Sequence, residues 1–163
     1  TIKINKNTKN KRDGSFCFLK INSSRTSIKI ANTKEVKKVK KFISTTKAPA
    51  AVGPYSQAVE ANGTLYVSGQ IPFVPETMTL VSDDIKIQTK QSLENIKAIV
   101  TEAGYAMEDI VKCQVFLKDM NDFVAVNGVY EAFFEGHKPA RCAVEVARLP
   151  KDVGVEIDAI AVK

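Results

Sequence analysis

The sequence contains no tryptophan and only one histidine, His137. A single histidine excludes chemistry that relies on a pair of histidines as general acid and general base. His137 follows Gly136 in an expected loop, so we expect its ring to be solvated. The three cysteines are scattered at Cys17, Cys113 and Cys142. They form neither a disulfide framework nor the paired spacing of a metal site, so we expect a reducing compartment and no bound metal.

Long hydrophobic runs are also missing. No stretch approaches the 18 consecutive apolar residues that a membrane-spanning helix requires. We therefore predict a soluble product without a membrane partner.

Acidic residues are nearly absent from the first 47 residues, which hold 14 Lys or Arg and only 2 Asp or Glu. The remaining 116 residues hold 10 basic and 16 acidic side chains, so the net charge of +6 combines two parts of opposite sign. We therefore predict a basic leader, residues 1–47, and one ordinary folded domain, residues 48–163.

The leader is rich in Lys, Asn, Ser and Thr, without sustained periodicity, so it lacks the apolar surface needed to offset the entropy of ordering. We expect it to be disordered. Its composition is typical of an organelle transit peptide, plastid-type or mitochondrial, although such peptides favour Arg over Lys. Because the chain begins at Thr1, we also expect an upstream segment, and a signal peptide there would make the leader the second half of a plastid-type address. The alternatives are a cytoplasmic protein with a lysine-rich extension, and non-specific contact of the leader with nucleic acid or acidic membrane.

The body alternates between strand and helix patterns. Residues 55–60 and 63–69 predict a hairpin, since Asn62-Gly63 supplies the positive φ of a tight turn. Apolar spacing predicts a helix from about Asp84 to Ala103, ended by Gly104, and a second from about Asn121 to Phe134, begun by Asn121 or Asp122 and ended by Gly136. Further strands are expected at residues 110–117, after residue 138 and at 155–162, the last two separated by a break at residues 149–152.

This order predicts an α+β fold with one mixed sheet and two helices on one face. Two helices cover only one face of such a sheet. The last strand nevertheless carries apolar residues in both registers, at 155, 157, 159 and 161 and again at 160 and 162. Because an uncovered apolar face is usually buried in a partner, we predict a closed homo-oligomer whose sheets pack against each other.

Two charged residues indicate a site. Arg141 starts one predicted strand, and Glu156 lies fifteen residues later in the next, so the two can face a common cleft. A guanidinium offers a fork of donors that matches a carboxylate, and a glutamate can accept a proton or hold a water molecule. The pair therefore indicates a site for a small anionic substrate.

Five segments in order resemble the Rid family, also called YjgF, and in particular its reactive intermediate deaminase A branch. The segments are Gly53-Pro54-Tyr55-Ser56-Gln57-Ala58, Val67-Ser68-Gly69-Gln70-Ile71-Pro72, Gln91-Ser92-Leu93-Glu94-Asn95-Ile96, Asn127-Gly128-Val129-Tyr130, and Pro139-Ala140-Arg141 continuing through Glu156-Ile157. The resemblance covers essentially all of residues 48–163 and leaves the leader outside.

This resemblance implies a chorismate-mutase-like fold and a homotrimer with active sites between subunits. It also implies hydrolysis of reactive 2-enamine and 2-imino acids, such as 2-aminoacrylate and 2-iminobutyrate, to 2-keto acids and ammonia, which protects pyridoxal-phosphate enzymes. No cofactor is expected, since an imino acid is already electrophilic and the enzyme has only to orient it, admit water and manage protons.

The resemblance also implies roles for five residues. Arg141 would bind the substrate carboxylate, Glu156 would handle water, and Tyr55, Ser68 and Asn127 would line the cleft, with Tyr55 also counted as catalytic. Without the family, Arg141 would be an ordinary surface cation and Glu156 part of a solvated strand face. Tyr55 could equally pack in the hairpin, Asn127 could be a polar group on a helix surface, and Ser68 could serve a bend.

One departure from the family concerns the cysteine. Many bacterial members have a cysteine two residues after the arginine, where this chain has Ala143 and places Cys142 one residue earlier. Strand alternation points Cys142 away from the side of Arg141, so we do not expect it to be catalytic.

Two other functional classes compete with the deaminase. One is a trimeric module that binds a small acid for regulation without turnover, and the other is an RNA-contacting translation inhibitor or endoribonuclease. The net acidic body argues against nucleic acid as a partner, except for non-specific contact through the leader. A chaperone role is a further alternative.

Overall fold

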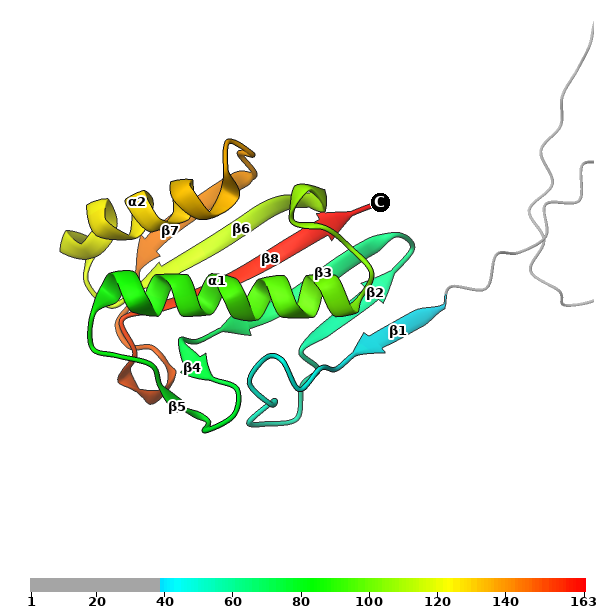
Figure 1. Ribbon diagram of the computed structural model, residues 1–163, viewed down its shortest axis with the longest axis horizontal. Coiled ribbons are helices and arrows are strands. Elements are labelled where there is room, and N and C mark those ends of the chain that lie inside the picture. The colour runs from blue at the N-terminus through cyan, green and yellow to red at the C-terminus, as the bar shows by residue number, and fades with distance from the viewer. Residues whose placement is uncertain (1–38) are drawn as a thin grey trace, which may run out of the picture. The chain divides into compact units, whose positions relative to one another are not determined.

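The computed structural model describes residues 39–163, which form one compact unit, Val39–Lys163 (Figure 1). Its centre is a six-stranded sheet in the order β1-β2-β3-β8-β6-β7, in which only the β6–β7 pair is parallel. The strands are β1 Lys40–Ile43, β2 Ala58–Ala61, β3 Thr64–Gln70, β6 Ile110–Leu117, β7 Ala140–Glu145 and β8 Val155–Val162. The helices are α1 Ile85–Glu102 and α2 Phe123–Phe134.

The predicted α+β fold with two helices on one face of a mixed sheet is confirmed. Figure 1 shows α1 and α2 on the same side of the sheet, with α1 lying over β3 and β8. The core lies between the helices and the sheet. Its fully buried large side chains are Leu65, Leu93, Ile96, Ile99, Val100, Ile110, Val115, Leu117, Val126, Val155 and Ile157.

The first strand lies inside the range that the composition assigned to the leader. β1 pairs with β2, for example Phe42 with Val59, and Ile43 reaches the core. The predicted end of the leader at residue 47 is therefore too late. The sequence did not indicate β1, because this strand is held by pairing with β2 and has no hydrophobic pattern of its own. Residues 1–38 lie outside the described residues, so disorder and organelle targeting there stay predictions.

The predicted hairpin and its turn are confirmed. β2 and β3 pair antiparallel, with Ala61 opposite Thr64. The connecting residues Asn62 and Gly63 have φ values of 54° and 75°. Positive φ at both central residues matches the right-handed twist of the two strands.

The helix ends follow local hydrogen bonding. Asp84 is the N-cap of α1, and Gly104 follows its end with φ at 83°, as predicted. α2 begins two residues later than predicted because Asp119 accepts a hydrogen bond from the Asn121 N–H at 2.8 Å and starts a short 3-10 turn, Met120–Asp122. No helix within residues 39–163 is long and apolar enough to cross a membrane.

A two-stranded ribbon, β4 Phe73–Val74 and β5 Thr79–Leu80, precedes α1 and was absent from the prediction. The buried Asn95 of α1 fixes this region, because its Nδ2 donates to the carbonyl oxygens of Ile71 and Phe73, both at 3.1 Å. Such short strands carry too little periodicity to be recognised in a sequence.

The sheet face opposite the helices is uncovered in the single chain. One row of paired residues crosses four strands on this face, from Phe42 through Val59 and Tyr66 to Ile160. Phe42 is 69% exposed and Tyr66 is 52% exposed. An apolar row of this kind favours burial against another protein surface.

Removing the α1 cap should destabilise the domain measurably. The Asp84 Oδ1 accepts from the backbone N–H groups of Lys86 at 2.7 Å and Ile87 at 3.2 Å. We expect Asp84→Ala to lower the free energy of unfolding by about 1 kcal/mol, in the range found for lost N-caps. Denaturant unfolding measures the change, with the exposed neighbour variant Asp83→Ala as the control. Equal effects of the two substitutions would contradict the capping role.

Candidate functional site

Three of the predicted site residues line one pocket. Tyr55 comes from the loop before β2, Ser68 from β3 and Glu156 from β8, and they surround a cavity of about 520 Å³. The turn between β7 and β8 contributes Pro150 and Lys151 to the same cavity. The pocket therefore combines one carboxyl group, two hydroxyl groups and one amino group.

Gly69 makes room for the carboxyl group of Glu156. A Cβ atom at residue 69 would lie 1.9 Å from the Glu156 Oε1, which no side chain could tolerate without displacing the carboxyl. The ladder between β3 and β8 also shifts its register between Val67 and Gln70. An interrupted ladder and a missing side chain together let the glutamate lie against the β3 backbone.

The environment of Glu156 favours its protonated form more than water does. Burial first, and then the negative charge of Asp158, raise the pKa of Glu156 above its ordinary value. Asp158 itself is held by Gln114, whose backbone N–H and Nε2 donate to the carboxylate at 3.1 Å and 2.7 Å. A carboxylate with a raised pKa is a stronger base than an ordinary glutamate, which suits it to accept and return a proton.

A buried amide holds the loop that carries Tyr55. The Nε2 of Gln57 donates to the carbonyl oxygens of Pro49 at 2.8 Å and Thr45 at 3.0 Å, and its Oε1 accepts from the Thr45 N–H at 2.7 Å. The Ser68 Oγ donates to the Ser56 carbonyl oxygen at 2.7 Å. Tyr55 itself is 49% exposed, so its ring lines the mouth of the pocket and does not pack in the core of the hairpin.

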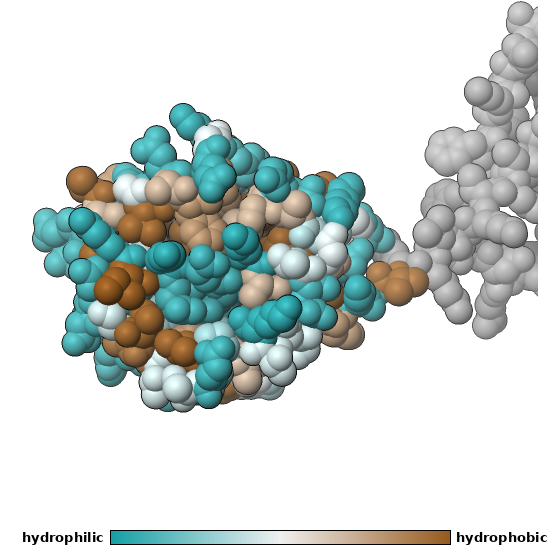
Figure 2. All heavy atoms as spheres, viewed as in Figure 1, coloured by the Kyte–Doolittle hydropathy of each residue, from teal (hydrophilic) through white to brown (hydrophobic). Residues whose placement is uncertain are grey.

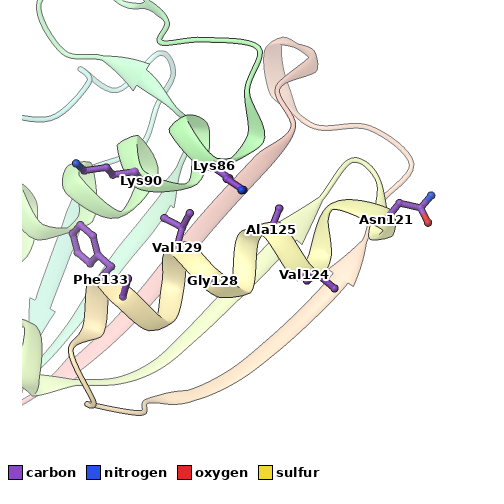
Figure 3. A pocket seen from close by; sticks show the side chains of 9 residues that line it. Lys86, Lys90, Asn121, Val124, Ala125, Gly128, Val129 and Phe133 are labelled. Carbon is purple, nitrogen blue, oxygen red and sulfur yellow. The ribbon is translucent and has the colours of Figure 1, made fainter.

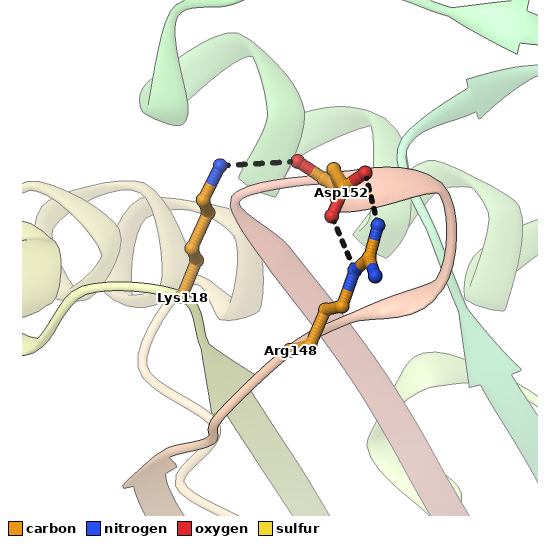
Figure 4. A network of polar contacts seen from close by, with 3 residues as sticks. All are labelled: Lys118, Arg148 and Asp152. Carbon is orange, nitrogen blue, oxygen red and sulfur yellow. Dashed lines mark hydrogen bonds and ion pairs between the residues drawn. The ribbon is translucent and has the colours of Figure 1, made fainter.

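The turn beside the pocket is closed by an ion pair (Figure 4). The Arg148 Nε lies 2.7 Å from the Asp152 Oδ1, and a terminal nitrogen donates to Oδ2 at 2.9 Å. The Lys118 Nζ donates to the Asp152 carbonyl oxygen at 3.5 Å. Lys151 and Asp152 both have positive φ, 59° and 58°, so the bidentate pair spans a turn of unusual backbone conformation. This turn carries Lys151 into the pocket lining.

Arg141 lies in a separate aromatic setting. Its guanidinium is 4.8 Å from the ring centroid of Tyr130 and 5.6 Å from that of Phe123, both on α2. Within residues 39–163 it forms no ion pair. Aromatic faces hold a guanidinium through cation–π attraction and leave its donor fork free for a carboxylate.

Two buried polar atoms on α2 lack hydrogen-bond partners within the described residues. They are the Asn127 Oδ1 and the Tyr130 hydroxyl. The Cys113 thiol lies next to this hydroxyl, and burial raises the pKa of the thiol to about 11, so it stays protonated. Buried polar atoms without partners are costly, and they are commonly completed by a ligand, water or another chain.

The single chain does not bring Arg141 and Glu156 together. Arg141 pairs in register with Cys113, whose side chain is buried under the helices, and its guanidinium contacts α2. Glu156 lies between the fully buried Val155 and Ile157, so strand alternation points it to the uncovered face. Within one chain, Arg141 and Glu156 therefore do not face the common cleft that the sequence suggested. Tyr55, Ser68 and Glu156 form one group, and Arg141 lies apart from it against α2, the helix that also carries Asn127.

The histidine and the exposed cysteine take no part in either group. The His137 Nε2 lies 2.7 Å from the Ile110 carbonyl oxygen, so the expectation of a merely solvated ring is wrong and its role is structural. Cys142 is an exposed free thiol that follows Arg141 on β7. The sequence did not indicate Gly69, Phe123 or Tyr130 as parts of the site, although Gly69 and Tyr130 lie inside the motifs that carried the resemblance.

The chain is similar in sequence to several known proteins. The family described as Endoribonuclease L-PSP matches residues 45–163. A 2-iminobutanoate/2-iminopropanoate deaminase of Salmonella typhimurium is 56% identical over 126 residues, which cover 76% of this chain and 98% of the relative. A RutC family protein of Pyrococcus horikoshii is 56% identical over 125 residues, covering 77% and 99%.

Two crystal structures from Escherichia coli are similar in fold as well as sequence. The YjgF gene product has a TM-score of 0.73 and 55% identity, covering 76% of this chain and 98% of its own. TdcF with bound serine has a TM-score of 0.73 and 49% identity with the same coverage. Since the family match spans the whole described domain except its first strand, and the relatives align over nearly their full length, this chain belongs to the Rid family, which includes the YjgF, RutC and L-PSP proteins.

Proposed function

We propose that this chain hydrolyses 2-imino acids, and the enamines that tautomerise to them, to 2-keto acids and ammonia. The observation that carries the proposal is the Glu156 pocket, whose half-buried carboxyl has a raised pKa and lies against Gly69 beside Ser68. The Salmonella relative bears the name of such a deaminase and is 56% identical over nearly its full length. The natural substrates would be small imino acids such as 2-iminobutyrate and 2-iminopropionate.

The complete site would form between two copies of the chain. Each copy holds one group with Glu156 and another with Arg141, and the uncovered sheet face exposes the apolar side chains of Phe42 and Tyr66. A homotrimer with the sheets packed inward would bury this face and set Arg141 of one subunit opposite the Glu156 pocket of its neighbour. Heterologous contacts of this kind close into a ring and give every subunit one complete site.

In this site, Arg141 would hold the substrate carboxylate through two charge-assisted hydrogen bonds. The ionised Glu156 would take a proton from water as the water oxygen bonds to C2 of the imino acid. The C=N bond becomes a C–N single bond, and Glu156 passes the proton it took to the imine nitrogen, which gives the neutral carbinolamine and restores the ionised carboxylate. Glu156 then takes the proton of the C2 hydroxyl and passes it to the amino group; the C–N bond breaks, ammonia leaves, and the hydroxyl becomes the carbonyl of the keto acid. Water is the only co-reactant.

Ser68, Tyr55 and Asn127 would supply the remaining contacts. The Ser68 hydroxyl donates to the Ser56 carbonyl oxygen, so its lone pairs face the pocket as acceptors. Tyr55 would close the mouth and offer its hydroxyl. The unpartnered Asn127 Oδ1 would accept a hydrogen bond from substrate or water in the assembled site.

The direct test is release of 2-ketobutyrate from 2-iminobutyrate, generated in place by threonine dehydratase while semicarbazide competes for the imine. We expect the protein to accelerate keto-acid release above the spontaneous rate. Arg141→Ala should lower this acceleration by at least about tenfold to a hundredfold, because a lost hydrogen bond to a charged group costs about 1.5–3 kcal/mol. Arg141→Lys should recover only part of it, since an ammonium lacks the planar fork.

Folding and assembly of each variant are checked by circular dichroism and by mass in solution. If the wild-type oligomer binds a small acid but gives no acceleration, the deaminase proposal fails and a binding module takes its place. Unchanged activity in the Arg141→Ala variant would show that Arg141 does not bind the substrate.

Mixing two inactive variants tests the shared site. Arg141→Ala and Glu156→Gln each destroy one group, so homo-oligomers of either variant should be inactive. After joint refolding in equal amounts, about a quarter of inter-subunit sites would receive Arg141 from one chain and Glu156 from the other. We expect activity to return to that fraction of the wild-type rate. A mixture as inactive as its components, despite mixed oligomers in native mass spectrometry, would contradict a site shared between subunits.

The acid limb of the pH profile should report Glu156. Because the ionised carboxylate is the base, activity is present above its pKa and lost as the pH falls through it. Asp158 raises this pKa, so Asp158→Asn should move the acid limb of kcat/KM to lower pH. Rates are corrected for spontaneous hydrolysis, and Glu108→Gln, an exposed carboxyl outside the site, serves as the control. An acid limb unaffected by Asp158→Asn would assign the limb to another group.

A further inference from the structure

A groove runs between α1 and α2 on the outer surface of the helical layer. Its volume is about 760 Å³, and it shares no lining residue with the Glu156 pocket. Figure 3 shows Ala125, Val129 and Phe133 pointing from α2 towards α1, from which Lys86 and Lys90 extend. The groove therefore has an apolar side on α2 and a basic side on α1.

The α2 side of the groove is made of small or exposed apolar residues. Ala125, Gly128 and Ala132 recur at helical spacing, and a Cβ atom added at Gly128 would meet no atom within 4 Å. Val124 at its end is 80% exposed. Small side chains on a helix surface allow another helix to approach closely and pack its ridges into the grooves between them.

The α1 side carries a row of positive charge. Lys86 and Lys90 are one helical turn apart, and Lys97 lies further along α1, beyond the exposed Glu94, with its Nζ 5.7 Å from the Phe133 ring. No Asp or Glu lines the groove. Residues 39–163 hold 13 basic and 16 acidic side chains, so this basic row stands out from a domain that is net acidic. The spacing of the lysines matches acidic side chains at i and i+4 on an opposing helix.

We propose that this groove is the docking site for an amphipathic helix of a partner protein, with acidic side chains flanking its apolar face. Figure 2, which views the helical face, shows hydrophobic residues exposed among hydrophilic ones over the region of α2. The apolar stripe of the partner would lie on Ala125 and Val129, and its acids would face Lys86 and Lys90. This is recognition of a helix in a groove, with charge fixing its orientation.

Charge also decides against two other occupants. Residues 1–38 of this chain hold 11 basic and 2 acidic side chains, so they would be repelled by the lysine row. A second copy would present the same basic groove. The uncovered sheet face, which the proposed trimer would bury, lies on the other side of the sheet, so docking at the helices and assembly through the sheet do not compete.

The test uses the full chain and a fluorescent peptide of about 18 residues, about five helical turns, with Leu at i, i+3, i+4 and i+7 and Glu beside this stripe. Fluorescence anisotropy should show binding that weakens with added salt. Lys86→Glu with Lys90→Glu should weaken it about tenfold or more, since each reversal turns an attraction into a repulsion. The matched control, Lys41→Glu with Lys138→Glu, makes the same change in net charge at exposed lysines outside the groove and should leave the affinity unchanged.

Three results would overturn the proposal. They are equal binding of a scrambled acidic peptide without an apolar stripe, equal weakening by the control variant, and tighter binding of the leader peptide 1–38. Retained deaminase activity in the Lys86→Glu, Lys90→Glu variant shows that its fold is intact, so lost peptide binding is then assigned to the groove.

Discussion

Two helices can cover only one face of a six-stranded sheet, and the rest of this structure depends on that constraint. The covered face buries the core residues of β3, β6 and β8 against α1 and α2. The opposite face displays a row of paired side chains from Phe42 to Ile160 without a covering layer. Strand alternation then distributes the functional residues over both faces, with Arg141 under α2 and Glu156 on the open side. The proposed assembly and the proposed site thus both depend on the sheet having one covered and one uncovered face.

Neutral side-chain amides give the pocket its rigidity. Gln57 binds the loop of residues 45–49, Asn95 binds the segment around β4, and Gln88 accepts from the Gly154 N–H at 2.8 Å. Each amide is buried and hydrogen-bonds to backbone groups of neighbouring loops and strand ends. Amides do this without adding charge, so the carboxyl of Glu156 is influenced mainly by its burial and by Asp158. The loops around the pocket are therefore fixed in place without a competing ion pair at its centre.

The parts of the fold with strong local signals could be predicted from the sequence. The Asn62-Gly63 turn, the two amphipathic helices and the strand at residues 110–117 each carry a pattern long enough to specify their type. β1 could not be predicted, since its four residues read as part of a basic leader and are held only by pairing with β2. The start of α2 was misplaced because the decisive hydrogen bond is accepted by Asp119, two residues before the predicted helix.

The sequence proposes members for the site, but it does not contain their arrangement. Motifs identified Tyr55, Ser68, Asn127, Arg141 and Glu156, yet the face to which each side chain points depends on sheet order, which no local pattern contains. The aromatic support of Arg141 was missed because Phe123 and Tyr130 fit the apolar stripe of α2, a pattern that indicates core packing. The same stripe serves both purposes, since Tyr130 buries its ring and also faces the guanidinium.

The absent side chain at residue 69 has an evolutionary consequence. A glycine codon becomes an alanine codon by a single base change, and the new methyl group would occupy the space of the Glu156 carboxyl while leaving Ser68, Tyr55 and the Arg141 setting in place. A duplicated gene could therefore displace the Glu156 carboxyl in one step and keep the rest of the cleft folded. The residue at position 69 is thus the first to compare between copies of such a gene.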